Sequence, residues 1–210
     1  CGPPLTGYRK ALEAGHMPAV RWYWASRDGP SLLAMEFHER GSYTEDATVS
    51  GILAAHGHIE ALKLARAQAP PCPWDEDTCK EAAQHGQLGM LQWLRAQVPP
   101  CRWDRATCAG AALHGHLTVL QWARAQECPW DHWTCEYAAK YGDLEVLQWA
   151  RAQVPPCPWD GATCSTAAGR GHLELLQWAQ ANGCPWDQNT CNQAALRGRL
   201  DILQWVRAQR

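Results

Sequence analysis

Cysteine is the residue type in this sequence with the most chemical potential, and its spacing is regular. Ten of the eleven cysteines form five pairs with six residues between the members: Cys72/Cys79, Cys101/Cys108, Cys128/Cys135, Cys157/Cys164 and Cys184/Cys191. Zinc sites usually place paired cysteines two to four residues apart and add two further ligands nearby. The spacing therefore favours small buried thiols, with disulfides and metal binding left open as alternatives, and we expect no metal ligands.

The remaining polar residues do not form a pattern typical of an enzyme. The sequence has no nucleophile–base constellation, no glycine-rich phosphate loop after a strand, and no recurring carboxylate pair. Four histidines follow a turn glycine, where a bond from the side chain to the backbone is expected: His16, His58, His116 and His172. Three histidines precede such a glycine: His56, His85 and His114. They are either exposed side chains without a special role, or they line one edge of the array and sense pH. We expect a protein without catalytic residues or cofactors.

These residues belong to an internal repeat that organises the chain. Five full copies of C-x-W-D-x-x-T-C-x-x-A-A-x-x-G-x-L-x-x-L-Q-W begin at the first cysteine of each pair, and the turn glycines from Gly57 to Gly198 recur every 27 or 29 residues. A fixed period of this kind is typical of solenoids. We expect one repeat domain over residues 1–210, with an insertion at 28–42 and units at about 5–27, 43–71, 72–100, 101–127, 128–156, 157–183 and 184–210.

Each repeat predicts two short helices. The aspartate after the conserved tryptophan stands where a helix N-cap belongs, and the glycine after Ala-Ala stands where the helix ends. The Leu-x-x-Leu-Gln-Trp segment gives the second helix an apolar stripe. Ten of the thirteen tryptophans occupy these repeated positions, and their register predicts that they lie in the core. The expected fold is an all-α helical-repeat solenoid of about seven helix-turn-helix units.

The T-C-x-x-A-A-x-x-G-H-L-E-V-L-Q-W pattern resembles the ankyrin repeat, and the resemblance covers about residues 7–210. The Cys-Pro-Trp-Asp opening and the shorter period resemble the short ankyrin-like arrays of giant viruses, oomycetes and algae. Ankyrin repeats have about 33 residues and a hairpin finger. The departures imply that the fingers are reduced or absent here. The resemblance implies a protein-binding scaffold with no chemistry of its own.

Charge and hydropathy limit the possible partners. The formal net charge is −2, and a sum of this kind argues against nucleic acid or an anionic membrane as the partner. No apolar run reaches the length of a membrane span, so we expect no direct membrane insertion. The free thiols favour a reducing compartment inside the cell. We therefore expect a protein partner, possibly within a large complex, and no nucleic acid.

The positions that vary between repeats indicate where a partner binds. They follow the cap aspartate, the second cysteine and the Ala-Ala pair, which places them on one face of the first helix, the expected concave surface. The fifth repeat carries an aromatic stripe there, flanked by basic residues from its neighbours. The predicted partner-binding residues are Trp133, Tyr137, Tyr141, His132, Glu136, Lys140, Arg105, Arg170 and Arg197. The alternative is that these aromatic rings pack on the small residues of the fourth or sixth repeat.

Two other functions are compatible with the sequence. The array stops at Arg210 directly after a second helix, which predicts an apolar end covered by another subunit of a permanent assembly. The paired cysteines would also suit a metal-binding or redox protein. The first hypothesis nevertheless remains a non-catalytic scaffold that binds a partner protein on its concave face.

Overall fold

The computed structural model describes residues 10–16, 18, 49–68 and 71–208. It divides into two parts, residues 1–103 and residues 104–210, which are considered separately here. Regular structure in the described ranges is helical throughout and contains no strand. The insertion at 28–42 lies outside the described residues, and of the expected first unit only residues 10–16 and 18 are described.

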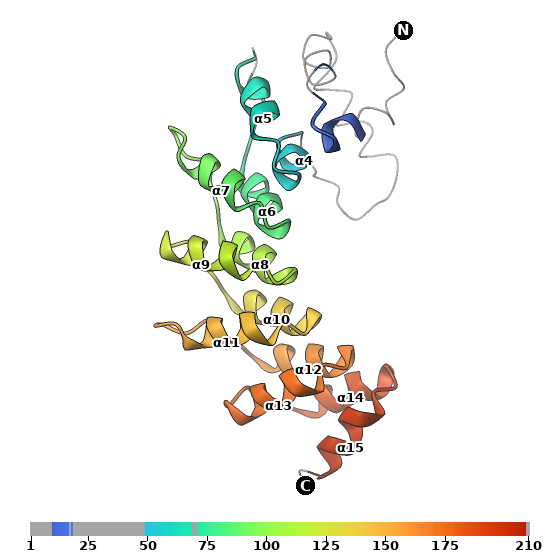
Figure 1. The fold of residues 1–210 in the computed structure, drawn as a ribbon. Coiled ribbons are helices and arrows are strands. Elements are labelled where there is room, and N and C mark those ends of the chain that lie inside the picture. Colours follow the sequence, from blue (N-terminus) through green and yellow to red (C-terminus); the bar gives the residue numbers. More distant parts are fainter. Residues whose placement is uncertain (1–9, 17, 19–48, 69–70, 209–210) are drawn as a thin grey trace. The chain divides into compact units, whose positions relative to one another are not determined.

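Each described repeat is a pair of short helices, helix A and helix B (Figure 1). In the first part the pairs are α4 (Val49–Ala55) with α5 (Ile59–Arg66) and α6 (Glu76–Gln84) with α7 (Leu88–Arg95). In the second part they are α8 (Arg105–Leu113) with α9 (Leu117–Ala125), α10 (His132–Tyr141) with α11 (Leu144–Ala152), α12 (Gly161–Arg170) with α13 (Leu173–Ala181), and α14 (Gln188–Leu196) with α15 (Leu200–Ala208).

The A helices pack closely on one another. Helix α4 packs on α6 in the first part, while α8, α10, α12 and α14 pack in sequence in the second, and each also contacts its own helix B. The two alanines of each repeat allow this close approach, and Ala138 and Ala139 of α10 have no solvent exposure. Because each short helix is supported by its neighbours, the expected helical-repeat solenoid fold is confirmed.

Local chemistry sets both ends of each helix A. The repeated aspartates cap the A helices as expected: Asp131 Oδ1, for example, accepts a hydrogen bond of 3.1 Å from the backbone N–H of Trp133. Helix α10 ends at Gly142, which adopts the left-handed conformation with φ of 78°. A side chain there would be strained, and its Cβ would lie 2.5 Å from the His172 ring.

The residue after the turn glycine links neighbouring repeats at four positions. His58 contacts the carbonyl oxygen of Glu13 through Nε2 at 2.7 Å, and His172 contacts that of Lys140 at 3.3 Å. Gln87 and Arg199 occupy the same position and donate to the carbonyl oxygens of Ala55 and Gly169. The expected backbone contact of the Gly-His position is confirmed for His58 and His172. His56, His85 and His114 are exposed.

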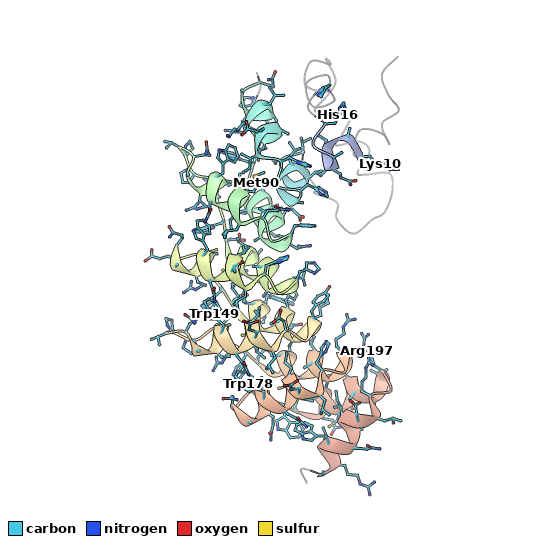
Figure 2. All side chains as sticks on the ribbon, in the orientation of Figure 1. Lys10, His16, Met90, Trp149, Trp178 and Arg197 are labelled. Carbon is cyan, nitrogen blue, oxygen red and sulfur yellow. The ribbon has the colours of Figure 1, made fainter. Side chains whose placement is uncertain are left out.

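The core consists mainly of leucine, alanine and cysteine, and tryptophan contributes less to it than expected. Leu147 and Ala150 of α11 are fully buried, as are Cys128 and Cys135 of the same repeat. The tryptophans in the repeated positions are only half-buried. Trp130 meets the edge of Trp149 with ring centroids 6.0 Å apart, and Trp149 and Trp178 stand on α11 and α13 (Figure 2). The core prediction for the tryptophans is therefore wrong in part, because these rings also form an outer layer against helix B.

An arginine covers four of these outer tryptophans. Arg151 lies over Trp159 at 4.0 Å from the ring centroid, and its Nη1 donates to the carbonyl oxygen of Cys157 at 2.5 Å. Arg66, Arg95 and Arg124 repeat this arrangement over Trp74, Trp103 and Trp130. We call these arginines and the Trp–Trp pairs Trp74/Trp93, Trp130/Trp149, Trp159/Trp178 and Trp186/Trp205 the Arg–Trp ladder.

The membrane criterion can be tested on the same helices. None of those in the described ranges is long and apolar enough to cross a bilayer.

Candidate functional site

The cysteines, which are the first candidates for chemistry, are free thiols, and nine of the ten described are buried. Several bond across repeats: Cys128 Sγ donates to the carbonyl oxygen of Asp104 at 3.4 Å, and Cys157 Sγ donates to that of Asp131 at 3.3 Å. Burial raises the pKa of Cys72 to about 12. A hydrogen bond with Cys157, together with burial, raises the pKa of Cys135.

Thiols of this kind are poor nucleophiles and poor ligands, because both roles need the thiolate. No group of three or more potential metal ligands occurs in the described ranges. The cysteines therefore connect one repeat to the next.

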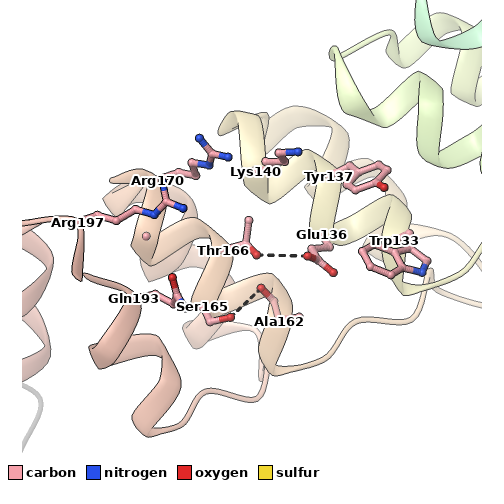
Figure 3. Close-up of a pocket in the computed structure, with 11 residues that line it drawn as sticks. Trp133, Glu136, Tyr137, Lys140, Ala162, Ser165, Thr166, Arg170, Gln193 and Arg197 are labelled. Carbon is pink, nitrogen blue, oxygen red and sulfur yellow. Dashed lines mark hydrogen bonds between the residues drawn. The ribbon is translucent and has the colours of Figure 1, made fainter. Parts of the chain in front are cut away.

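A groove lies across the A helices of the second part (Figure 3). It has a volume of about 440 Å³ and opens to solvent. Helix α10 contributes Trp133, Glu136, Tyr137 and Lys140, α12 contributes Ala162, Ser165, Thr166, Gly169 and Arg170, and α14 contributes Gln193 and Arg197. We call this the Trp133 groove.

Residue size on α12 shapes the Trp133 groove. A Cβ at Gly169 would lie only 3.3 Å from the Cβ of Gln193, so the glycine allows α12 and α14 to approach closely. Ala162 and Ser165 are also small, and Ser165 Oγ donates to the carbonyl oxygen of Ala162 at 3.2 Å. The aromatic residues of α10 therefore border an open space.

Aromatic rings form one wall of the groove. Trp133 is 43% exposed and contacts Tyr137 with ring centroids 5.6 Å apart. The His132 ring also contacts Trp133, with ring centroids 5.1 Å apart. Tyr141 is 50% exposed but lies outside the groove, where its ring meets His114 at 5.3 Å. The stripe thus continues along α10 beyond the groove.

Three cations and one carboxylate line the groove. Lys140 Nζ lies 5.7 Å from the Tyr137 ring centroid, and Arg170 and Arg197 are exposed on α12 and α14. Among the described residues, none of these cations has a carboxylate oxygen within 4.0 Å. Arg105, in contrast, forms an ion pair of 3.3 Å with Asp131. The groove therefore has uncompensated positive charge.

Glu136 is the exception to this charge pattern. Its Oε1 accepts a hydrogen bond of 3.4 Å from Thr166 Oγ1. Burial and the nearby charge of Asp160 raise the pKa of Glu136, and Thr166, His132 and Lys140 lower it to a lesser extent. A carboxylate held beside aromatic rings and among cations gives the groove one strong hydrogen-bond acceptor.

The structure brings together six of the nine predicted site residues: Trp133, Glu136, Tyr137, Lys140, Arg170 and Arg197. His132, Tyr141 and Arg105 lie outside the groove, and the role of all nine stays a prediction. The sequence-based site omitted Thr166, Ser165, Gly169 and Gln193, although all four occupy the same variable positions of their repeats. Their variability between repeats was a signal that could have found them. The aromatic rings were easier to recognise because they are large.

Comparison with known proteins finds matches among solved structures alone. No family model matches the chain, and no curated protein matches it. Among the solved structures that match, two cover all of this chain and are both of the pentatricopeptide repeat protein PPR10 in complex with an 18-nucleotide psaJ RNA element, one of them with three cysteines replaced by serine. Each has a TM-score of 0.43 and 14% identity. The chain spans 37% of the length of these structures.

Two expectations are corrected here. The chain was expected to bind a protein partner and to exclude nucleic acid, but both similar structures are helical-repeat proteins bound to RNA. The exclusion relied on the net charge of −2, which sums over the whole chain and conceals the local excess of Lys140, Arg170 and Arg197 in one groove. The ankyrin resemblance stays a prediction, since these two structures belong to another repeat family.

Proposed function

We propose that this protein is a non-catalytic helical-repeat protein that binds single-stranded nucleic acid in the Trp133 groove. The observation that carries the proposal is the exposed Trp133 ring, which stands beside Tyr137 and three cations without carboxylate partners. Its support is this local chemistry, and the likeness to the two RNA complexes adds nothing to it.

A single strand offers the two chemical features that this groove can bind. Its unpaired bases are planar and stack on aromatic side chains, each stack contributing about 1–3 kcal/mol to binding. Its phosphates attract lysine and arginine. The lining holds three cations and one carboxylate, an excess of two positive charges, which favours an anion despite the negative charge of the whole chain.

The groove also fits a flexible strand better than a duplex. It crosses three short helices and presents a partly exposed tryptophan to solvent, whereas the bases of a duplex are already stacked and turn their edges to the grooves. We therefore expect short unstructured RNA or DNA to bind more tightly than the corresponding duplex. Contacts to the ribose 2′-hydroxyl would distinguish RNA from DNA.

Fluorescence anisotropy with labelled ten-nucleotide strands tests the proposal. We expect a Kd on the order of 1–100 µM in 50 mM salt, typical of contacts dominated by phosphate. Trp133→Ala should weaken binding about fivefold or more, because it removes a stacking surface. Trp133→Phe should retain most of the affinity.

A charge-matched pair of variants provides the control. Arg170→Ala/Arg197→Ala removes two cations from the groove, and Arg102→Ala/Arg207→Ala removes two exposed cations outside it. Only the first should weaken binding. The log–log slope of affinity against salt should be roughly −2 for the native groove and shallower for the first variant. If neither RNA nor DNA binds in 50 mM salt, or if both double variants lose affinity equally, the proposal is wrong.

A further inference from the structure

Glu136 occupies an unusual position in the Trp133 groove. Its carboxylate lies at the base of the aromatic wall, one helical turn after Trp133 on α10 and opposite Thr166 on α12 (Figure 3). Thr166 Oγ1 donates to Oε1, and no hydrogen bond or ion pair to Oε2 forms within the described residues. One carboxylate oxygen thus remains available as an acceptor, and the other keeps part of its capacity.

This position is unfavourable for a groove that only attracts phosphate. A carboxylate repels phosphate, and partial burial already raises the pKa of Glu136. Asp160 adds a like charge, while His132 and Lys140 on α10 oppose it. An acceptor-only group in this setting is most useful when a ligand brings hydrogen-bond donors to it.

The four bases differ in the donors that they can offer to a carboxylate. Guanine presents two adjacent donors on its Watson–Crick edge, N1–H and the N2 amino group, which match the two oxygens of a carboxylate. Adenine and cytosine place a ring-nitrogen acceptor beside their amino group, and uracil places carbonyl oxygens on both sides of N3–H. Guanine is therefore the base whose Watson–Crick edge offers a carboxylate two adjacent donors.

We propose that Glu136 makes the Trp133 groove selective for guanine, with the base stacked on Trp133 and its Watson–Crick edge on the Glu136 carboxylate. This inference rests on the proposed function. Trp133 and Glu136 are three residues apart on one helix and line the same groove, so the carboxylate lies next to the partly exposed ring. Recognition of splayed bases by stacking and edge contacts is the usual route to sequence preference in single strands.

The test measures the affinity of the full chain for eight-nucleotide oligouridylate strands with one central substitution. Guanine at the centre should bind about tenfold more tightly than uracil, adenine or cytosine, within the range of one bidentate contact. Inosine keeps N1–H but lacks the N2 amino group, and should give an intermediate affinity. The same series in DNA shows whether the preference depends on the ribose.

Glu136→Gln supplies the decisive variant, with Glu145→Gln as its control. The amide can no longer accept two donors, so the variant should bind all strands but lose the guanine preference. Glu145 is exposed on α11 outside the groove, and its variant should keep the preference. Lowering the pH should also reduce the guanine-to-uracil affinity ratio, because a protonated Glu136 cannot accept both bonds.

The outcomes separate this inference from the proposed function. Equal binding of all four bases by the native chain would overturn the guanine selection and leave the proposed function intact. A guanine preference that survives Glu136→Gln would assign selection to another residue and also overturn the inference. Failure to bind any strand in 50 mM salt would overturn both.

Discussion

The Arg–Trp ladder and the Trp133 groove use the same residue types for different purposes. In the ladder, Arg151 lies over Trp159 and donates to the carbonyl oxygen of Cys157, so both the cation and the ring have intramolecular partners. In the groove, Trp133 is 43% exposed, and Arg170 has no carboxylate within 4.0 Å among the described residues. A tryptophan and an arginine thus indicate packing where the fold supplies partners for both, and binding where the ring is exposed and the cation has no carboxylate partner.

A pair of alanine substitutions should show the largest difference in stability between the two regions. Trp159→Ala should lower the free energy of unfolding by about 3 kcal/mol, at the lower end for tryptophan truncation because the ring is half-buried. Trp133→Ala should lower it by less than about 1 kcal/mol, since the ring has fewer neighbours to lose. Urea unfolding followed by circular dichroism measures both. Equal losses would remove the distinction between the two regions.

The arginine of the ladder should matter almost as much as its tryptophan. Arg151→Ala removes a charged hydrogen bond to the Cys157 carbonyl oxygen and the cation over Trp159, and should destabilise the fold by about 2 kcal/mol. Arg170→Ala, its counterpart in the groove, should leave the free energy of unfolding within about 0.5 kcal/mol of the native value. A stable Arg151→Ala protein would show that the ladder is only a surface arrangement.

One repeat lacks the arginine and allows the opposite change. Gln180 stands where the other repeats have arginine, and Trp186 and Trp205 meet at an interplanar angle of 39°. The angle is 68° for Trp159 and Trp178, which Arg151 supports. Gln180→Arg should therefore stabilise the fold by about 1 kcal/mol. Thermal unfolding of this variant beside the native chain would show the gain. An unchanged unfolding temperature would mean that an arginine over Trp186 adds no stability.

The smallest expected effect concerns pH and Glu136. Burial and Asp160 raise the folded pKa of this carboxyl above its unfolded value, so folding favours the protonated form. The corresponding stability is fully present below the unfolded pKa and is lost as pH rises through the folded pKa. Glu136→Gln should flatten this part of the stability–pH curve. Unfolding midpoints between pH 4 and pH 7 would reveal it, and identical curves for the two proteins would contradict the assignment.

The sequence predicted the features that local rules govern. The aspartate caps and turn glycines were predicted because each depends on a few consecutive residues, as at Asp131 and Gly142. The backbone contacts of His58 and His172 were also expected, since the position recurs at every turn. Repetition made these predictions reliable because the same cap and turn residues recur at the same position in several repeats.

The features that depend on side chains meeting across repeats were predicted less well. The repeated tryptophans looked like core, but Arg151 covers Trp159 from outside and leaves it half-buried. The groove was predicted only through its aromatic wall, because the contribution of Gly169 depends on how closely α12 and α14 approach. Nucleic acid was excluded on net charge, which conceals where the cations gather.

The most direct test is ¹⁹F NMR of the full chain labelled with 5-fluorotryptophan and titrated with a guanine-containing oligonucleotide. The Trp133 signal can be assigned from the spectrum of Trp133→Phe, and ladder signals from Trp159→Phe and Trp178→Phe. We predict that the Trp133 resonance shifts as the strand is added while the ladder resonances stay in place. A stationary Trp133 resonance at saturating strand, or a shift confined to Trp159 and Trp178, would contradict the assignment of the groove as the binding surface.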